Sequence, residues 1–168
     1  MGRGTHRVMV KSSRVIGLIS DTHGLMRADV HTALAGVELI LHAGDVGGDE
    51  ILDELALIAP VRAVYGNTDA PGQPRLTTSI DIELDGVSVH VSHGHEVGSP
   101  TPAKLLARYN ADVIVYGHTH KPMIARADTR WAVNPGAAGP RRFDILPSIA
   151  RMTIQGGQVD VTLVELAP

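Results

Sequence analysis

Three short apolar runs in the first part of the chain are separated by stretches whose apolar residues recur at helical spacing. The runs cover 14–20, 38–44 and 61–66, and the stretches between them cover 27–35 and 50–58. A strand that is followed by a helix and then by another strand typically forms a parallel pair with a right-handed crossover. The alternation therefore predicts a βαβαβ unit with a parallel sheet at the start of the fold.

The second half of the chain reads mainly as a run of strands. Residues 79–86 and 87–93 flank an Asp-Gly turn and predict a hairpin. Residues 101–110 predict a helix, because a capping Thr precedes a Pro at its first position. The remaining strand patterns cover 112–118, 123–128, 130–134, 148–155 and 158–166. A parallel half followed by an antiparallel half predicts two packed mixed sheets with helices outside.

Length and composition narrow the class of protein. A chain of 168 residues is long enough for one domain with a substantial core, so we expect a single domain over 14–168 after a disordered tail over 1–13. Cysteine is absent, which excludes disulfides, a cysteine zinc site and a thiol nucleophile. The net charge of −3 gives no electrostatic footprint for nucleic acid or an anionic membrane. No apolar run resembles a signal peptide or reaches the ~18 residues of a membrane span, and we expect a cytoplasmic protein.

Several strand patterns end in polar residues that can bind metals. Asp21 and His23 end the first one and, two positions apart, share a face. Later strand ends carry the motifs HAGD (42–45), GNTD (66–69), SHGH (92–95) and GHTH (117–120). In several of these a Gly precedes the polar residue, where we expect the backbone to approach closely or turn sharply. Such a mixture of carboxylate, carboxamide and imidazole ligands suits borderline divalent metals. Seven ligands suit two ions that share a carboxylate, and seven residues form this set: Asp21, His23, Asp45, Asn67, His93, His118 and His120.

The ordered motifs DTH, GDV, GNTD, SHGH, GHTH and NPG resemble those of the calcineurin-like metallophosphoesterase superfamily. Within it, the chain is similar to the small bacterial and archaeal phosphodiesterases of the YfcE/MJ0936 type, whose eukaryotic relative is the retromer subunit Vps29. The resemblance extends from about Val15 to Leu166. It implies an α/β fold, a four-layer α/β/β/α sandwich of two mixed β-sheets flanked by helices, which agrees with the strand and helix patterns.

The resemblance also implies which residues hold the metals and what the site does. It assigns Asp21, His23 and His120 to one ion, Asn67, His93 and His118 to a second, and Asp45 to a bridging position. The cofactors would be two divalent ions, manganese first, with nickel, iron, cobalt or zinc as alternatives. A metal-bridging hydroxide would attack the phosphorus of a small phosphoester, so the implied function is that of a phosphodiesterase or phosphatase.

One residue of the catalytic pattern is missing. Many members of the superfamily carry a His after the Asn, which protonates the leaving group, whereas this chain has Thr68. General acid catalysis is worth roughly 10²–10⁴-fold, so we expect modest activity on esters with poor leaving groups. His95 is the nearest substitute acid, and it reads equally well as a loop imidazole bonded to backbone. Asn67 and Asp69 complete the catalytic candidates, with a structural role as the alternative for Asp69.

Other polar residues leave alternatives open. Arg141 and Arg142 would clamp a phosphate, or they are solvated loop charges. Asn134 of the NPG motif is expected to build a turn near the metals, and His42 to be a packed or hydrogen-bonded strand residue. Specificity is expected to come from the loops 70–78, 96–101 and 137–147.

A second hypothesis is a Vps29-like protein-interaction scaffold with weak or no catalysis. The complete ligand set favours the enzyme, while Thr68 keeps the scaffold in consideration. A nuclease acting on long DNA is disfavoured by the net charge of −3 and the lack of a basic stripe. Related small proteins form dimers or tetramers, so a homodimer or a homotetramer stays open.

Overall fold

Eleven strands and three short α-helices make up the fold of residues 13–168, the part of the chain that this computed structural model describes. The strands are β1 (Arg14–Ile19), β2 (Leu39–His42), β3 (Val61–Val64), β4 (Leu76–Thr77), β5 (Ile80–Leu84), β6 (Val87–Val91), β7 (Val113–Val115), β8 (Met123–Ala127), β9 (Arg130–Asn134), β10 (Ser148–Gln155) and β11 (Gln158–Glu165). The helices are α1 (Val30–Ala33), α2 (Asp49–Ala56) and α3 (Pro102–Arg108), with a 3-10 helix η1 at His95–Val97. The tail expected over 1–13 lies outside the described residues except for Ser13.

The strands form two mixed sheets, one with the order β11-β10-β1-β2-β3-β4 and one with the order β5-β6-β7-β9-β8. In the first sheet β1 to β4 run parallel, as the βαβαβ pattern predicts, and β10 pairs antiparallel with β1. In the second sheet β6, β7 and β9 also run parallel, and only the edge strands β5 and β8 are antiparallel. The expectation of an antiparallel second half is therefore wrong at the centre of this sheet, where α3 supplies a crossover between β6 and β7, whereas β10 and β11 pair antiparallel as expected.

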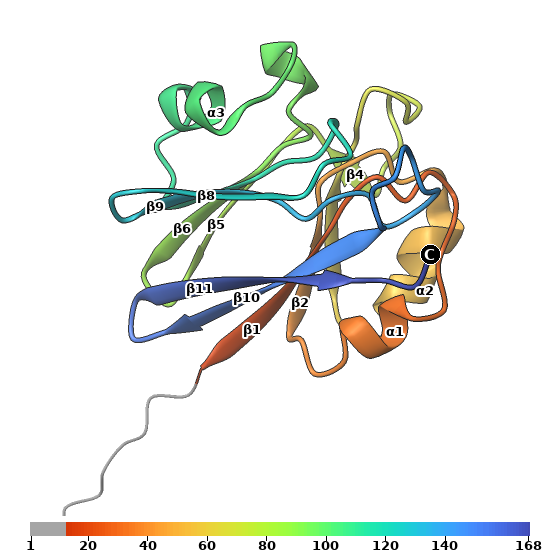
Figure 1. Cartoon of the computed structure of the whole chain (residues 1–168), viewed down its shortest axis with the longest axis horizontal. Helices are drawn as coiled ribbons and strands as arrows, with labels where there is room; N and C mark the ends of the chain where they lie inside the picture. The colour runs from red at the N-terminus through yellow and green to blue at the C-terminus, as the bar shows by residue number, and fades with distance from the viewer. Residues whose placement is uncertain (1–12) are drawn as a thin grey trace, which may run out of the picture.

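Three clusters of buried side chains lie between the four layers of the molecule. The largest fills the space between the sheets and includes Leu18 of β1 and Val89 of β6. A second lies under α1 and α2 and includes Leu55, and a third packs Leu105 of α3 against Ile114 of β7. Figure 1 shows α3 over one sheet and α1 and α2 beside the other. The structure therefore confirms the α/β/β/α sandwich.

Helix α3 begins as its sequence predicts. The Thr101 side chain accepts a hydrogen bond from the backbone N–H of Lys104, and Pro102 is the first helical residue. This short helix packs mainly on β7 and β9, and its C-terminal end reaches β6, where Tyr109 stacks on His90.

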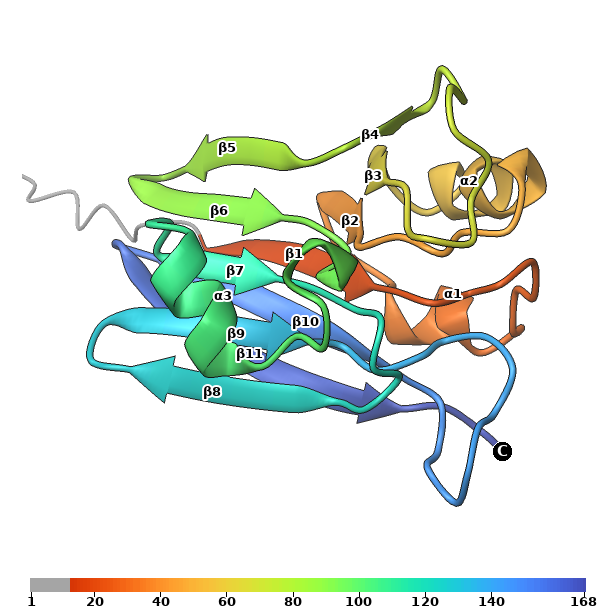
Figure 2. The same ribbon diagram turned by 90° about the horizontal axis from the view of Figure 1, so that it is seen from above.

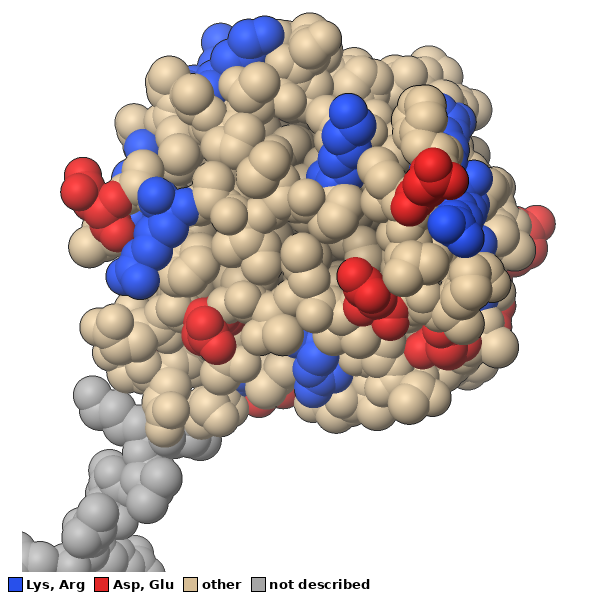
Figure 3. Space-filling model, viewed as in Figure 1, with Lys and Arg blue, Asp and Glu red and all other residues tan. Residues whose placement is uncertain are grey.

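Both sheets direct strands toward the same end of the sandwich. Figure 2 shows the arrowheads of β1, β6 and β7 pointing the same way, so the loops that follow these strands begin close together. On the face shown in Figure 3, acidic and basic side chains are interspersed. Among residues 13–168, no helix has the length and apolar character that crossing a membrane requires.

Candidate metal centre

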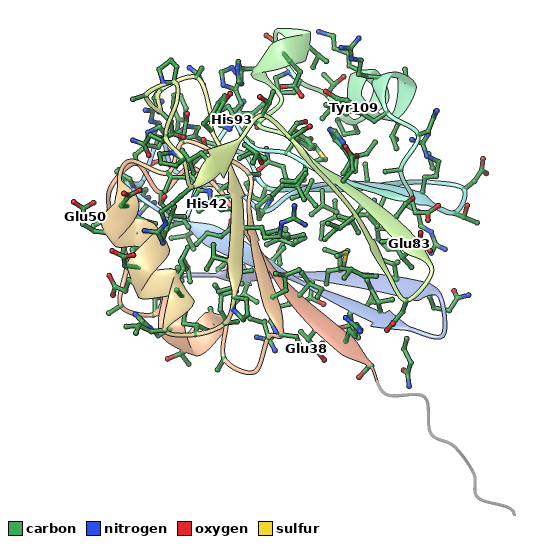
Figure 4. All side chains as sticks on the ribbon, turned by 180° about the vertical axis from the view of Figure 1, so that it is seen from behind. Glu38, His42, Glu50, Glu83, His93 and Tyr109 are labelled. Carbon is green, nitrogen blue, oxygen red and sulfur yellow. The ribbon has the colours of Figure 1, made fainter. Side chains whose placement is uncertain are left out.

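The loops at this end of the sandwich bring together all seven predicted metal ligands. Asp21 and His23 follow β1, Asp45 follows β2, Asn67 follows β3, His93 follows β6, and His118 and His120 follow β7. Figure 4 shows His93 in the upper part of the molecule with His42 below it. Residues separated by as many as 99 positions therefore meet at one place.

The first group of ligands has the spacing expected around one ion. One donor atom each from Asp21, His23, Asp45 and His120 lies within 4.8 Å of the others. The Nε2 atom of His120 is 3.4 Å from Oδ1 of Asp21, and Nε2 of His23 is 3.7 Å from the same oxygen. The two Nε2 atoms are 3.3 Å apart. A cluster of histidine and carboxylate donors of this kind is typical of a catalytic metal site.

A second group adjoins the first through Asp45. The Oδ1 atom of Asn67 is 3.1 Å from Nε2 of His93 and 3.1 Å from Nδ1 of His118. The Oδ2 atom of Asp45 is 3.2 Å from His93 Nε2 and 3.6 Å from His23 Nε2. Asp45 thus contacts both groups with the same oxygen, which is the position of a bridging ligand.

The orientation of these groups fits a metal cation. The backbone carbonyl of Ala43 lies 2.8 Å from Nδ1 of His93 and can only accept, so Nδ1 carries the proton. Nε2 of the same ring faces two further acceptors, the oxygens of Asp45 and Asn67. In addition, the fully buried Oδ1 of Asp21 has no hydrogen-bond partner among the described residues. Burial acts to lower the pKa of His93, but the bond to Asp45 outweighs it, so a proton on Nε2 supplies positive charge here in metal-free protein. A divalent metal, which this donor set suits, can replace that proton.

The pKa values follow from the same arrangement. Burial acts to raise the pKa of Asp45, but the ring of His93 and the Thr68 N–H outweigh it and hold the pKa well below its usual range. Burial also acts to raise the pKa of Asp21, but the nearby histidines outweigh it, with the largest contribution from His23, and the pKa is lowered overall. Both carboxyl groups are therefore ionised at neutral pH, the state that metal binding requires.

Each carboxylate has one oxygen tied to the protein and the other directed at the ligand cluster. Asp21 Oδ2 accepts hydrogen bonds from the Ser20 hydroxyl at 2.7 Å and from the His118 backbone N–H at 3.2 Å. Asp45 Oδ1 accepts from the Thr68 backbone N–H at 3.0 Å. These bonds orient the carboxylates before any ion binds. No sequence signal identified Ser20, because a serine that ends a strand is common.

Five of the seven predicted ligands have a left-handed backbone. Their φ angles are 54° at Asp21, 45° at His23, 54° at Asp45, 73° at His118 and 62° at His120. Among the other described non-glycine residues, only Asp85, Asp128 and Phe143 have positive φ. This conformation costs an L-residue roughly 1–2 kcal/mol, and such strain concentrates at functional sites. The sharp turns direct successive polar side chains into one small volume.

Two glycines allow the loops to approach the carboxylates. A Cβ on Gly66 would overlap Oδ1 of Asp45. A Cβ on Gly117 would overlap the Ser20 hydroxyl and lie 2.7 Å from Oδ2 of Asp21. The expectation that glycines in these motifs permit close backbone approach is confirmed at both positions.

Two further motif residues hold the loops in place. The Asn134 amide donates to the Gly117 carbonyl at 3.2 Å and to the Thr119 hydroxyl at 3.0 Å, and its oxygen accepts from the Gly136 N–H at 2.9 Å. The NPG motif therefore builds a turn that supports the GHTH loop, as expected.

Asp69 has the contacts of a structural residue. Its two carboxylate oxygens accept hydrogen bonds from three backbone N–H groups, those of Val46, Gly47 and Gly66, at 3.1, 3.1 and 2.9 Å. These bonds fasten the loop after β2 to the loop after β3, in agreement with the structural alternative for this residue.

The remaining candidates lie at the rim of the centre. His95 is exposed on η1, with its ring centroid 5.3 Å from that of His93 and 6.3 Å from that of His118. Thr68, which stands at the sequence position of the missing acid, is exposed as well. Arg141 and Arg142 are exposed on the loop that follows β9. The His95 ring therefore borders the predicted ligands His93 and His118.

His42 supports the centre from below. The Gly44 N–H donates to its Nδ1 at 3.1 Å, so Nε2 carries the proton and donates to the Thr22 hydroxyl at 2.9 Å. Thr22 in turn donates to the Val46 carbonyl at 2.7 Å. This chain links the loop after β1 to the loop after β2. Thr22, between two ligands, was not singled out in the sequence because its partner lies on another strand.

Burial of His42 predicts a pH-dependent stability. Desolvation lowers its pKa from 6.5 to about 4, so protons bind the unfolded chain more tightly in this interval. Its contribution to the free energy of unfolding is complete above about pH 6.5 and is lost as the pH falls toward 4. From pH 7.5 to 5.0 we expect a loss of about 2 kcal/mol from this group in metal-free protein. Urea unfolding of the protein and of His42→Gln, which cannot titrate, should show a shallower pH dependence for the variant; equal slopes would contradict the assignment.

Comparisons with known proteins identify the family and the fold. Residues 15–157 match the calcineurin-like phosphoesterase superfamily domain. A probable metallophosphoesterase of Methanothermobacter thermautotrophicus is 36% identical over 159 residues, which cover 89% of this chain and 91% of that protein. Phosphodiesterase MJ0936 of Methanocaldococcus jannaschii is 28% identical over 139 residues, 72% of this chain and 82% of that one. Vacuolar protein sorting 29 of Cryptosporidium parvum has the same fold, with a TM-score of 0.77 at 22% identity over 93% of this chain and 99% of the other.

Proposed function

This chain belongs to the calcineurin-like phosphoesterase superfamily, and we propose that within it the protein is a dinuclear-metal-dependent phosphodiesterase that hydrolyses small phosphoesters. The observation that carries the proposal is the meeting of all seven predicted ligands at one end of the sandwich, with Asp45 in contact with both groups. The relative named as a phosphodiesterase supports the class of reaction. A cytoplasmic location stays a prediction.

We assign the metal ligands as two sets that share one residue. Asp21, His23 and His120 would hold one ion, Asn67, His93 and His118 the other, and Asp45 both. Manganese suits this mixture of oxygen and nitrogen donors, as do nickel, iron, cobalt and zinc. When bound, the two ions lower the pKa of water and withdraw negative charge from the phosphoryl group.

The other residues of the site position the ester. The amide of Asn67 donates to a phosphate oxygen while its carbonyl oxygen faces the second ligand group. From the rim, His95 gives a proton to the departing alcohol. Asp69 keeps the two loops together and thereby the distance between Asp45 and Asn67.

Metal dependence tests the proposed function. Metal-stripped protein should not hydrolyse bis-p-nitrophenyl phosphate, and addition of Mn²⁺ should restore turnover, followed as release of p-nitrophenolate. Titration calorimetry of the same sample reports whether the metal binds. Binding without turnover for Mn²⁺, Ni²⁺, Co²⁺ and Zn²⁺ would favour the alternative of a protein-interaction scaffold, which the fold shared with vacuolar protein sorting 29 supports.

The choice of leaving group separates the roles of His95 and Thr68. p-Nitrophenolate departs without a proton, whereas phenolate benefits from one. His95→Gln should therefore slow diphenyl phosphate hydrolysis by roughly tenfold or more while changing bis-p-nitrophenyl phosphate hydrolysis much less. Thr68→His, at an exposed position, should raise the rate with diphenyl phosphate. An equal loss with both esters in His95→Gln would show that His95 is not the acid.

A further inference from the structure

A cavity of about 330 Å³ lies beside the candidate metal centre. Its size falls in the range of small-ligand sites, roughly 300–1,000 Å³. His95 belongs to its lining, and the centroid of this ring is 5.3 Å from that of the predicted ligand His93. Figure 4 shows His93 and Tyr109, another lining residue, in the same upper part of the molecule. A group attached to a phosphate at the metal centre can therefore extend into this cavity.

The cavity lies on the outer face of β6, beside the C-terminal end of α3. Val89 and Val91 of this strand point into the core between the sheets. The alternate residue His90 therefore faces outward, and Tyr109, directly after α3, stacks on its ring with centroids 3.8 Å apart. The two rings form one wall of the cavity.

The lining of this cavity is made entirely of residues that can form hydrogen bonds. All nine residues around it have a polar atom in the side chain, and none is aliphatic. Tyr65, Thr78 and Ser79 supply hydroxyls, and Glu96 and Arg108 supply charges of opposite sign. The Tyr65 and Thr78 hydroxyls lie 2.9 Å apart and the Tyr109 hydroxyl donates to Glu96 at 2.8 Å, so these groups are partly paired with one another. An apolar alcohol bound here would cover their remaining donors and acceptors, which is costly. A ligand with several hydroxyls can donate to and accept from such groups.

His90 adds a buried nitrogen without a partner. The residue is only 4% exposed, and its Nδ1 lies 2.7 Å from a carboxylate oxygen of Asp81. Because that carboxylate accepts, Nδ1 is the donor. The Nε2 atom of the same ring is buried and has no hydrogen-bond partner among residues 13–168. Buried polar atoms in folded proteins are nearly always paired, so a ligand hydroxyl that entered between His90 and the neighbouring side chains of the cavity would complete this side chain.

We propose that the cavity binds the alcohol portion of the phosphoester and that this alcohol is polyhydroxylated, as a sugar or a polyol is. The proposal rests on the proposed function for the reaction, but binding of the alcohol itself needs no metal. The proposal also assigns a role to the loops 70–78 and 96–101, from which we expect specificity, since Thr78 and Glu96 line the cavity.

Binding of a free sugar to the metal-stripped full chain tests this directly. In a ¹⁵N-labelled sample, methyl α-D-glucopyranoside should shift the backbone amides of Ser92, Glu96 and Tyr109 in a saturable way. Cyclohexylmethanol, a ring of similar size with a single hydroxyl, should shift them far less. No saturable shift, shifts that lie elsewhere, or equal binding of cyclohexylmethanol would overturn the proposal.

Matched variants test which side chains act. His90→Phe keeps a ring against Tyr109 but removes both nitrogens, and it should weaken sugar binding about tenfold. His31→Phe is its control, because Nε2 of His31 pairs with the Glu54 carboxylate at 2.9 Å on the helical layer of the other sheet. Unchanged affinity in His90→Phe would count against the proposal.

A second pair of variants covers the case in which His90→Phe folds poorly. Arg108 and Arg126 are both exposed and each lies over an aromatic ring, but only Arg108 lines this cavity. Arg108→Ala should weaken sugar binding severalfold and Arg126→Ala should not, whereas equal effects would overturn the proposal. If sugar binding persists in a protein that hydrolyses no phosphodiester with any metal, the proposed function fails while the cavity remains a polyol site.

Discussion

Replacing Asp45 by Asn is expected to lower Mn²⁺-dependent hydrolysis of bis-p-nitrophenyl phosphate by roughly 10³-fold or more. The carboxylate oxygen of Asp45 lies 3.2 Å from His93 and 3.6 Å from His23, so its charge serves both ligand groups. The amide oxygen of the variant can still accept the Thr68 N–H, which preserves the loop contact. The loss therefore reflects the missing charge rather than a displaced loop.

Asp112→Asn is the matched control for this change. Its carboxylate also accepts a backbone N–H, that of Ser88, at 2.9 Å, but it lies outside the ligand cluster. We expect it to retain activity within a few-fold. Titration calorimetry should show Mn²⁺ binding weakened in Asp45→Asn and unchanged in the control. Activity of Asp45→Asn within tenfold of the parent protein would refute a shared ligand at this position.

Gly117→Ala is expected to damage both stability and metal binding. The added methyl would overlap the Ser20 hydroxyl and crowd Oδ2 of Asp21, the oxygen that Ser20 and the His118 N–H hold in place. Forcing extra volume into a packed site costs about 1–3 kcal/mol. Because Asp21 must rotate or its loop must move, we expect the affinity for Mn²⁺ to fall by roughly 10- to 100-fold. Urea unfolding of metal-free protein and titration calorimetry measure the two effects separately.

Gly72→Ala distinguishes this local damage from a general effect of losing a glycine. Gly72 has a φ of +82° and no atom within 4 Å of an added Cβ. The change should cost about 1 kcal/mol of stability through backbone strain and leave Mn²⁺ affinity unaltered. Equal Mn²⁺ affinities for the two variants would show that close approach at Gly117 does not orient Asp21.

The strand ends and their motifs could be predicted from sequence because both depend on local patterns. Runs such as 61–66 and the alternation of 79–86 encode strands, and polar residues that end parallel strands share an edge. Strand direction in the second half could not be read in this way, since pairing of β7 with β9 depends on contacts that no local pattern encodes. Helix α1 is also shorter than 27–35, and the two-residue strand β4 carries too little pattern to be recognised.

Within the site, the residues with distinctive chemistry were found, and so were the supporting residues Asn134 and Asp69, but the hydroxyls of Ser20 and Thr22 were not. Histidines and aspartates in GHTH or GNTD stand out, whereas the Ser20 hydroxyl acts only because the fold brings it to Oδ2 of Asp21. A structural role for Asp69 was among the alternatives, but its partners were not predicted, since two of its three donors, Val46 and Gly47, lie 22–23 positions away. Hydrogen-bond partners of this kind are set by the packing of loops and leave no spacing in the sequence.

The ligand cluster belongs to neither sheet alone. Four ligands follow strands of the sheet that contains β1, and three follow strands of the sheet that contains β6. Ions bound there would cross-link the two sheets. Metal loading should therefore make the two sheets unfold together in a single cooperative transition. Conversely, a core substitution that slides one sheet over the other by about 1 Å would change the separation of the two ligand groups, and misplacement of this size can cost about 10²-fold in rate. The aliphatic interface between the sheets is thus a determinant of catalytic geometry as well as of stability.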